Sequence, residues 1–129
     1  MAEKSAVRTE SAPAPFQGAP YSQGIKTGDL VFVAGQVGMV PGESEVRGGI
    51  EEQTEQVFAN LRTILEEAGS GLDSVVKTTV FLVDISDFPA MNAVYARHAG
   101  EVPPARSTIG VAALPGGARV EIEAIARLA

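Results

Sequence analysis

Arg106 is the residue of this sequence best suited to bind a small acid. It follows two consecutive prolines, Pro103 and Pro104, and one alanine separates Pro104 from Arg106. Prolines fix φ and remove backbone donors, so the chain that leads to Arg106 is stiff. A planar guanidinium held at a stiff position can donate two parallel hydrogen bonds to a carboxylate. The segment suits a carboxylate-binding arginine, although taken alone it favours a surface arginine after an ordinary loop, and the rest of the chain changes that balance.

Glu121 and Glu123 are carboxylates that could transfer protons. They alternate with apolar residues over 118–128, which predicts a strand. A Pro-Gly-Gly turn precedes it and predicts a hairpin with residues 107–114, so that Glu121 would lie near Arg106. Burial would raise the pKa of Glu121 and a nearby arginine would lower it. Two solvated charges on an exposed strand face are the alternative.

The composition excludes several kinds of chemistry. The chain has no cysteine, so disulfides, thiolate catalysis and cysteine-bound zinc are excluded. His98 is the one histidine, so one chain cannot supply a multi-histidine metal site. We expect neither a metal nor a cofactor. A net charge of -6, with basic residues dispersed, disfavours binding to nucleic acid or to an anionic membrane.

A length of 129 residues suits one domain. Residues 1–19 are rich in Ala, Pro, Ser and Gly and predict an extended, poorly packed lead-in. Residues 20–129 are predicted to form the single domain. No apolar run is long enough for a signal peptide or a membrane span, which predicts a cytoplasmic protein.

Hydrophobic patterns predict the elements that position these residues. In chain order we predict a hairpin over residues 24–34, a helix over 51–68, a central strand over 74–83, a helix that begins after Asp84 or Ser86 and ends at Gly100, and the carboxyl-terminal hairpin. This order predicts an α+β fold in which two helices cover one face of a single sheet.

The other face of that sheet is predicted to be uncovered and mixed in character. Val75, Phe81, Val83 and Ile125 would lie there beside Lys77, Thr79 and the two glutamates. A monomer that exposes such a face risks indiscriminate association, and symmetric assembly is the usual remedy. The sequence therefore predicts a homo-oligomer.

Several segments in order along residues 6–127 carry a family resemblance. They are Ala19–Gly24, Ala34–Gln36, Gln53–Leu61, Val76–Phe81, Asp87-Phe88 with Asn92 and Tyr95, Pro104–Ser107, Leu114-Pro115 and Val120–Ala124. Together they resemble the RidA family, also called YjgF or reactive intermediate deaminases. The resemblance implies a chorismate-mutase-like single mixed sheet, a barrel-like homotrimer, and active sites in clefts between subunits.

Such family members hydrolyse the enamines and imines 2-aminoacrylate, 2-iminopropanoate and 2-iminobutanoate to 2-keto acids and ammonia. The resemblance implies catalytic roles for Arg106 and Glu121, and substrate contacts from Arg106, Tyr21, Asn92, Gly35 and Thr108. A packing role for the Tyr21 ring and a capping role for the Asn92 amide are the alternatives.

Two positions depart from the family pattern. Ala34 stands where many deaminases have serine, and Thr108 stands where some have cysteine. Both changes are expected to alter substrate preference. His98 matches no family role and is expected at a helix end.

Imine hydrolysis fits this composition because an imine carbon is already electrophilic. The reaction needs a held substrate, a placed water and proton transfers, without a covalent nucleophile or a metal. One alternative is a non-catalytic member that binds small carboxylates as a regulator or chaperone-like protein. The second is an endoribonuclease or translation inhibitor, which the acidic charge balance disfavours.

Overall fold

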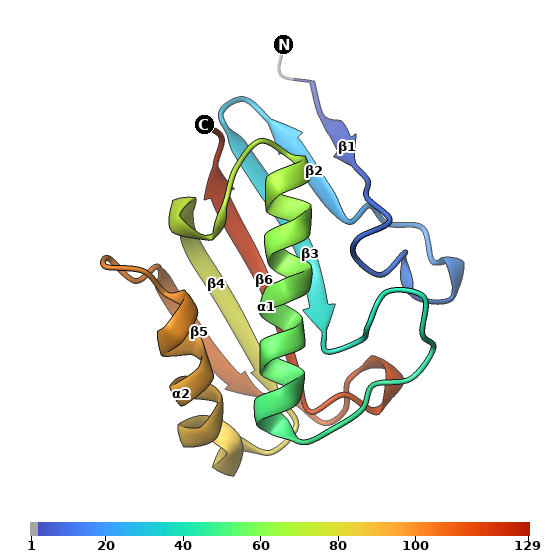
Figure 1. Cartoon of the computed structure of the whole chain (residues 1–129), viewed down its shortest axis with the longest axis vertical. Helices are drawn as coiled ribbons and strands as arrows, with labels where there is room; N and C mark the ends of the chain where they lie inside the picture. The colour runs from blue at the N-terminus through green and yellow to red at the C-terminus, as the bar shows by residue number, and fades with distance from the viewer. Residues whose placement is uncertain (1–2) are drawn as a thin grey trace.

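One six-stranded sheet carries both helices on the same face (Figure 1). The computed structural model describes residues 3–129. The strands are β1 (Ser5–Val7), β2 (Gly24–Thr27), β3 (Leu30–Val37), β4 (Val75–Leu82), β5 (Ala105–Gly110) and β6 (Val120–Arg127), and the helices are α1 (Ile50–Glu67) and α2 (Phe88–His98). Their order across the sheet is β1-β2-β3-β6-β4-β5. The predicted α+β fold with one mixed sheet is confirmed.

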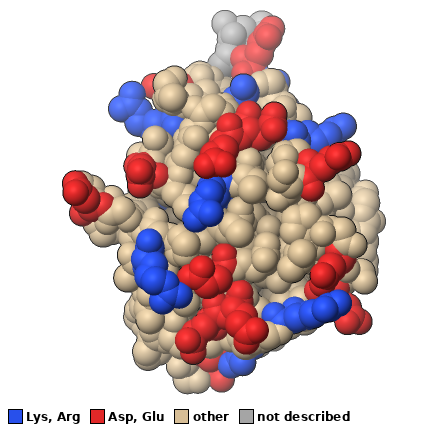
Figure 2. All heavy atoms as spheres, viewed as in Figure 1, with Lys and Arg blue, Asp and Glu red and all other residues tan. Residues whose placement is uncertain are grey.

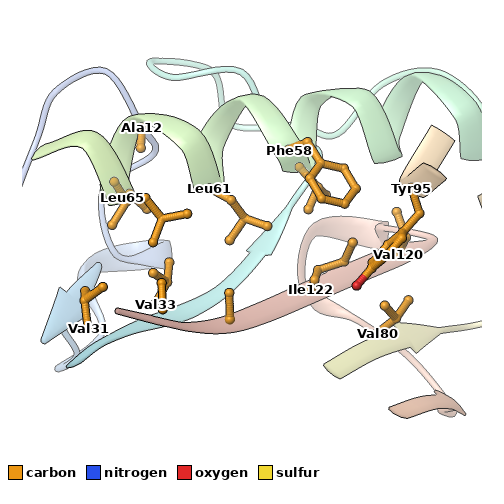
Figure 3. Packing of buried hydrophobic residues seen from close by; sticks show 14 of the residues in the cluster. Ala12, Val31, Val33, Phe58, Leu61, Leu65, Val80, Tyr95, Val120 and Ile122 are labelled. Carbon is orange, nitrogen blue, oxygen red and sulfur yellow. The ribbon is translucent and has the colours of Figure 1, made fainter. Parts of the chain in front are cut away.

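The core lies between α1 and the inner face of the sheet (Figure 3). Apolar side chains recur along α1 at helical spacing, and Val57, Leu61 and Ile64 are fully buried. Glu52 accepts a hydrogen bond from the Gly49 N–H at the start of this helix, over 3.2 Å. The helix ends before Gly69, whose positive φ of 86° suits glycine.

Helix α2 begins later than either predicted capping residue. Asp84 accepts a hydrogen bond from the Ser86 N–H over 2.9 Å, but this bond caps a short 3₁₀ turn at Ile85–Asp87. The α-helix itself starts at Phe88. The helix links β4 to β5, and this crossover explains why these two strands are parallel whereas all other strand pairs within residues 3–129 are antiparallel.

The predicted carboxyl-terminal hairpin is wrong. β5 pairs only with β4, and β6 lies between β3 and β4. The inward residues of β6 are fully buried, and such a row is most stable with a strand on each side. β5 is largely exposed and takes the edge. The Pro115–Gly117 segment forms a 3₁₀ turn that redirects the chain across the sheet.

The amino-terminal segment is better packed than the sequence suggested. Residues 1 and 2 of the expected lead-in lie outside the described residues, but β1 pairs with β2, and Val7 and Ala12 are only 4% and 3% exposed. The buried amide of Gln23 holds this segment, because its Nε2 donates to the carbonyls of Thr9, Ala12 and Pro13. The expectation of poor packing is therefore wrong here, and a domain boundary at residue 19 stays a prediction.

No helix within residues 3–129 lies over the second face of the sheet. Phe81 and Ile125 lie on this open face with Lys77 and Glu123, as predicted. Val75 does not, because a register shift between Val75 and Lys77 turns its side chain toward the core. Figure 2 shows that the opposite, helix-covered side carries charged residues of both signs. No helix within residues 3–129 is long and apolar enough to cross a membrane.

Candidate active site

Arg106 points toward the helix-covered side of the sheet. It lies on β5 opposite Thr78 of β4. Its Cζ atom lies 4.7 Å from the centre of the Tyr95 ring and 5.4 Å from that of Phe88, and both rings belong to α2. Within residues 3–129 no carboxylate forms a salt bridge with Arg106. Its N–H donors are therefore not consumed by an acid of the same chain.

Asn92 and Thr108 lie on the same side as Arg106. Asn92 occupies the stripe of α2 that carries Phe88 and Tyr95, four and three residues away. Thr108 is two residues beyond Arg106 on β5 and so faces the same way. The Asn92 Oδ1 and Thr108 Oγ1 atoms are buried and have no hydrogen-bond partner within residues 3–129. We call Arg106, Asn92 and Thr108 the arginine half-site.

Gly35 and Glu121 are in close contact on the open face. Gly35 lies where the register between β3 and β6 shifts, and Glu121 pairs with Val37 just beyond that point. A Cβ added at Gly35 would overlap Glu121 Oε2 and come within 2.8 Å of Glu121 Cδ. Glycine therefore lets the carboxylate lie directly against the backbone, and a side chain at this position would displace it.

Tyr21 lines a hollow beside this carboxylate. Its hydroxyl oxygen accepts a hydrogen bond from the Phe16 N–H over 2.6 Å, which fixes the ring against the amino-terminal segment. The hollow has a volume of about 390 Å³, and its walls include Phe16, Val37, Gly35 and Glu121. We call Tyr21, Gly35 and Glu121 the glutamate half-site. A hollow of about 450 Å³ under the amino-terminal segment also includes Tyr21 but no other predicted site residue.

The pKa of Glu121 is raised above its ordinary value. Burial is the larger cause, and the like charge of Glu123 on the same strand adds to it. The arginine of the same chain does not oppose this shift, because Arg106 lies on the other face of the sheet. A glutamate with a raised pKa is closer to the range in which it can both accept and donate a proton near neutral pH.

The predicted proximity of Arg106 and Glu121 within one chain is wrong. Alternation along β6 places Val120 and Ile122 in the core and Glu121 on the open face. Arg106 contacts α2 on the covered face. The chain therefore presents two half-sites on opposite sides of its sheet.

Phe88 and Tyr95, which the sequence shows among the family segments, contact Arg106, and that contact was not predicted. Their seven-residue spacing was the available signal, since it is two turns of a helix. Phe16, which lines the hollow beside the glutamate half-site, was not predicted either, and no spacing in the sequence pointed to it. Among residues 3–129 no cluster of His, Cys, Asp and Glu is arranged to hold a metal ion.

Comparison with known proteins supports one family. Residues 9–128 match the family model described as Endoribonuclease L-PSP. A RutC family protein from Pyrococcus abyssi is 49% identical over 95% of this chain and 96% of its own length. The chloroplastic Reactive Intermediate Deaminase A of Arabidopsis thaliana is 47% identical over 98% of this chain and 67% of its own length. The 2-iminobutanoate/2-iminopropanoate deaminase of Dermatophagoides farinae is 41% identical over 97% of each chain.

Solved structures agree with the sequence matches. The RidA protein of an Antarctic Psychrobacter superimposes with a TM-score of 0.91 at 44% identity, covering 96% of this chain and 99% of its own. E. coli TdcF, solved with bound serine, gives a TM-score of 0.90 at 34% identity, covering 97% and 99%. The chain therefore belongs to the RidA family, whose family model carries the description Endoribonuclease L-PSP.

Proposed function

We propose that this protein hydrolyses the enamine or imine forms of small 2-keto acids and releases ammonia. The substrates would be 2-aminoacrylate, 2-iminopropanoate and 2-iminobutanoate. One observation carries the proposal: the chain has both an arginine without an acidic partner among residues 3–129 and a glutamate of raised pKa, in a family that includes proteins named as deaminases.

The complete site in this proposal forms between subunits of a homotrimer. One chain carries its half-sites on opposite faces, so a neighbour has to bring its arginine half-site to the glutamate half-site. The open face supports such packing because it exposes Phe32 and Ile109 among polar residues. The side-chain oxygens of Asn92 and Thr108 support it too, since neither has a partner among residues 3–129 and buried polar atoms without partners are costly.

In this reaction Arg106 holds the substrate carboxylate by two charge-assisted hydrogen bonds, each worth about 1.5 to 3 kcal/mol. Glu121 accepts a proton from water while the water oxygen bonds to the imine carbon. That proton passes to the nitrogen, which gives a carbinolamine. The carbinolamine hydroxyl then loses its proton as the nitrogen gains one, so the carbon-nitrogen bond breaks and ammonia leaves as the carbonyl forms. An enamine first gains a proton at carbon and loses one from nitrogen, which converts it into the imine. Tyr21 would cover the substrate, and Asn92 and Thr108 offer oxygens to its N–H groups.

The test is a coupled assay in which a threonine dehydratase generates 2-iminobutanoate and semicarbazide traps what remains. The protein should speed the loss of imine. Arg106→Ala should abolish this effect while assembly stays intact, and Glu121→Ala should lower kcat with a smaller change in affinity. Arg97→Ala is the control, because Arg97 pairs with Glu55 on the surface. Full activity in Arg106→Ala would reject the proposal.

A non-catalytic carboxylate-binding role is the alternative, and the serine bound to TdcF is consistent with it. A binding protein of this kind would bind a 2-keto acid through Arg106 and leave the rate of imine loss unchanged. RNA cleavage is disfavoured by the net charge of -6, and cleavage that persists in Arg106→Ala would support it. A cytoplasmic location stays a prediction, because relatives include proteins named as chloroplastic and mitochondrial.

A further inference from the structure

We infer that Phe88 and Tyr95 are positioning residues for Arg106. Their rings hold the guanidinium, as an acidic side chain would otherwise do, so its N–H donors stay available to a carboxylate ligand. This inference rests on the proposed function, because it assumes that Arg106 binds the substrate. It adds two residues and a physical reason for the affinity of that site.

The geometry of Arg106 is that of a cation held by two aromatic rings. Its Cζ atom lies 4.7 Å from the Tyr95 ring centre and 5.4 Å from the Phe88 ring centre. Both distances are within the range of about 6 Å over which a ring attracts a cation. An aromatic face attracts the charge without occupying the N–H groups that point outward from the guanidinium edge.

Arg119 provides a comparison within the same chain. Its guanidinium donates to both carboxylate oxygens of Asp87, with Nη2–Oδ1 and Nη2–Oδ2 distances of 2.9 Å. An arginine held in that way has donors already engaged, and a ligand carboxylate would compete with Asp87. Arg106 has no such pair within residues 3–129, so its orientation has to come from other contacts.

Tyr95 is anchored firmly enough to serve as such a contact. Its hydroxyl shares a buried 2.7 Å hydrogen bond with Thr78 Oγ1, and its ring meets the edge of Phe58 at a centroid distance of 5.4 Å. Figure 3 shows the side chain reaching from its helix toward the sheet. Thr78 is also the β4 residue opposite Arg106. One hydrogen bond therefore ties the ring to the strand pair that carries the arginine.

Phe88 is an aromatic residue that remains 37% exposed. Core packing alone does not account for its position. It is the first residue of α2, and the bidentate pair between Asp87 and Arg119 holds that end of the helix to the residue that precedes β6. The Phe88 ring is thus presented to Arg106 from a fixed point of the backbone.

The test measures binding of sodium 2-oxobutanoate to the assembled protein by calorimetric titration. Phe88→Leu should weaken binding by about fivefold to tenfold, the loss expected for one ring under a partly desolvated cation. In the imine assay the same variant should raise KM more than it lowers kcat. Phe88→Tyr keeps a ring at this position and should restore affinity to within about twofold of the wild type.

Val94→Ala is the matched control for general damage to α2. Val94 is buried in the same helix but has no ring and so takes no part in the cation–π contact with Arg106. This variant should unfold at lower temperature and bind 2-oxobutanoate like the wild type. A second readout needs no ligand: ring currents should shift the Arg106 Hδ resonances upfield, and Phe88→Leu should reduce that shift.

The outcomes separate the two proposals. If Arg106→Ala binds 2-oxobutanoate as tightly as the wild type, the proposed function fails and this inference fails with it. If Arg106→Ala loses binding but Phe88→Leu keeps wild-type affinity and wild-type KM, only the positioning role is overturned. Loss of affinity in Phe88→Leu with recovery in Phe88→Tyr supports it.

Discussion

Arg106 and Glu121 lie on opposite faces of one sheet, although a single strand, β4, separates the two strands that carry them. Arg106 contacts two rings of α2, whereas Glu121 lies against the backbone of Gly35 on the open face. In the proposed assembly, an electrostatic effect of Arg106 on Glu121 would come from a neighbouring subunit. This relationship makes the proposed inter-subunit site testable without substrate.

The first prediction concerns the pKa of Glu121 in the assembled protein. A neighbour's arginine beside Glu121 would favour the charged carboxylate, so Arg106→Ala should raise the pKa of Glu121 further. The measurement is an NMR titration of the Glu121 Cδ resonance in both proteins. Arg97→Ala, on the surface of α2, should leave the titration unchanged. Identical curves for Arg106→Ala and the wild type would argue against a shared cleft.

The second prediction concerns the like charge on β6. Glu123 raises the pKa of Glu121, so Glu123→Gln should lower it. A raised pKa means that the folded chain keeps a proton which the unfolded chain has released, so stability falls as pH rises from the ordinary glutamate pKa to the raised one. In the Arg106→Ala background, the variant with Glu123→Gln should therefore lose less stability between about pH 4 and about pH 7 than the variant that keeps Glu123. Urea unfolding at one fixed protein concentration measures this, and an equal loss would contradict the assignment.

The third prediction compares two glycines of neighbouring sequence. A Cβ at Gly35 would meet the mobile end of Glu121, whereas a Cβ at Gly38 would lie 2.7 Å from the Gln53 backbone. Gly35→Ala should displace the carboxylate and lower kcat by about tenfold to a hundredfold, with little change in stability. Gly38→Ala should instead cost about 1 to 3 kcal/mol of stability, because the helix backbone has to shift.

Activity assays and thermal unfolding of both glycine variants separate these effects. The assignment of Gly35 to the site would not survive if Gly35→Ala kept full activity, or if it lost activity only through unfolding.

The fourth prediction concerns the buried hydrogen bond between Tyr95 and Thr78. Tyr95→Phe leaves the Thr78 hydroxyl buried without this partner and should cost about 1 to 3 kcal/mol of stability. The double variant Tyr95→Phe/Thr78→Val should recover part of that loss, since no polar group is left unpaired. Chemical unfolding of the four proteins completes a double-mutant cycle. Additive losses would show that the two hydroxyls are not coupled.

The local elements of this fold follow from short-range patterns in the sequence. The apolar stripe of residues 51–68 specifies α1, and the β-branched run at 74–83 specifies β4, because side-chain spacing and backbone preference act within a few residues. The stiff Pro103-Pro104 approach marked Arg106, and the family segments marked Glu121, Gly35 and Asn92 as site residues. Val75 faces the core instead of the open face because of a register shift, and the alternation of residues in the sequence does not reveal such a shift.

The sequence by itself determined the types of the elements, the family and the residues that could bind an acid or move a proton. Only the tertiary structure decided which strands are neighbours, and hence that β6 separates from β5 and that Arg106 and Glu121 face opposite ways. Alternation along a strand tells that two faces differ, but not which partner the strand takes. That choice depends on burying the apolar row of β6 at the centre of the sheet. This burial needs long-range contacts with the neighbouring strands and with α1, which short-range patterns in the sequence do not specify.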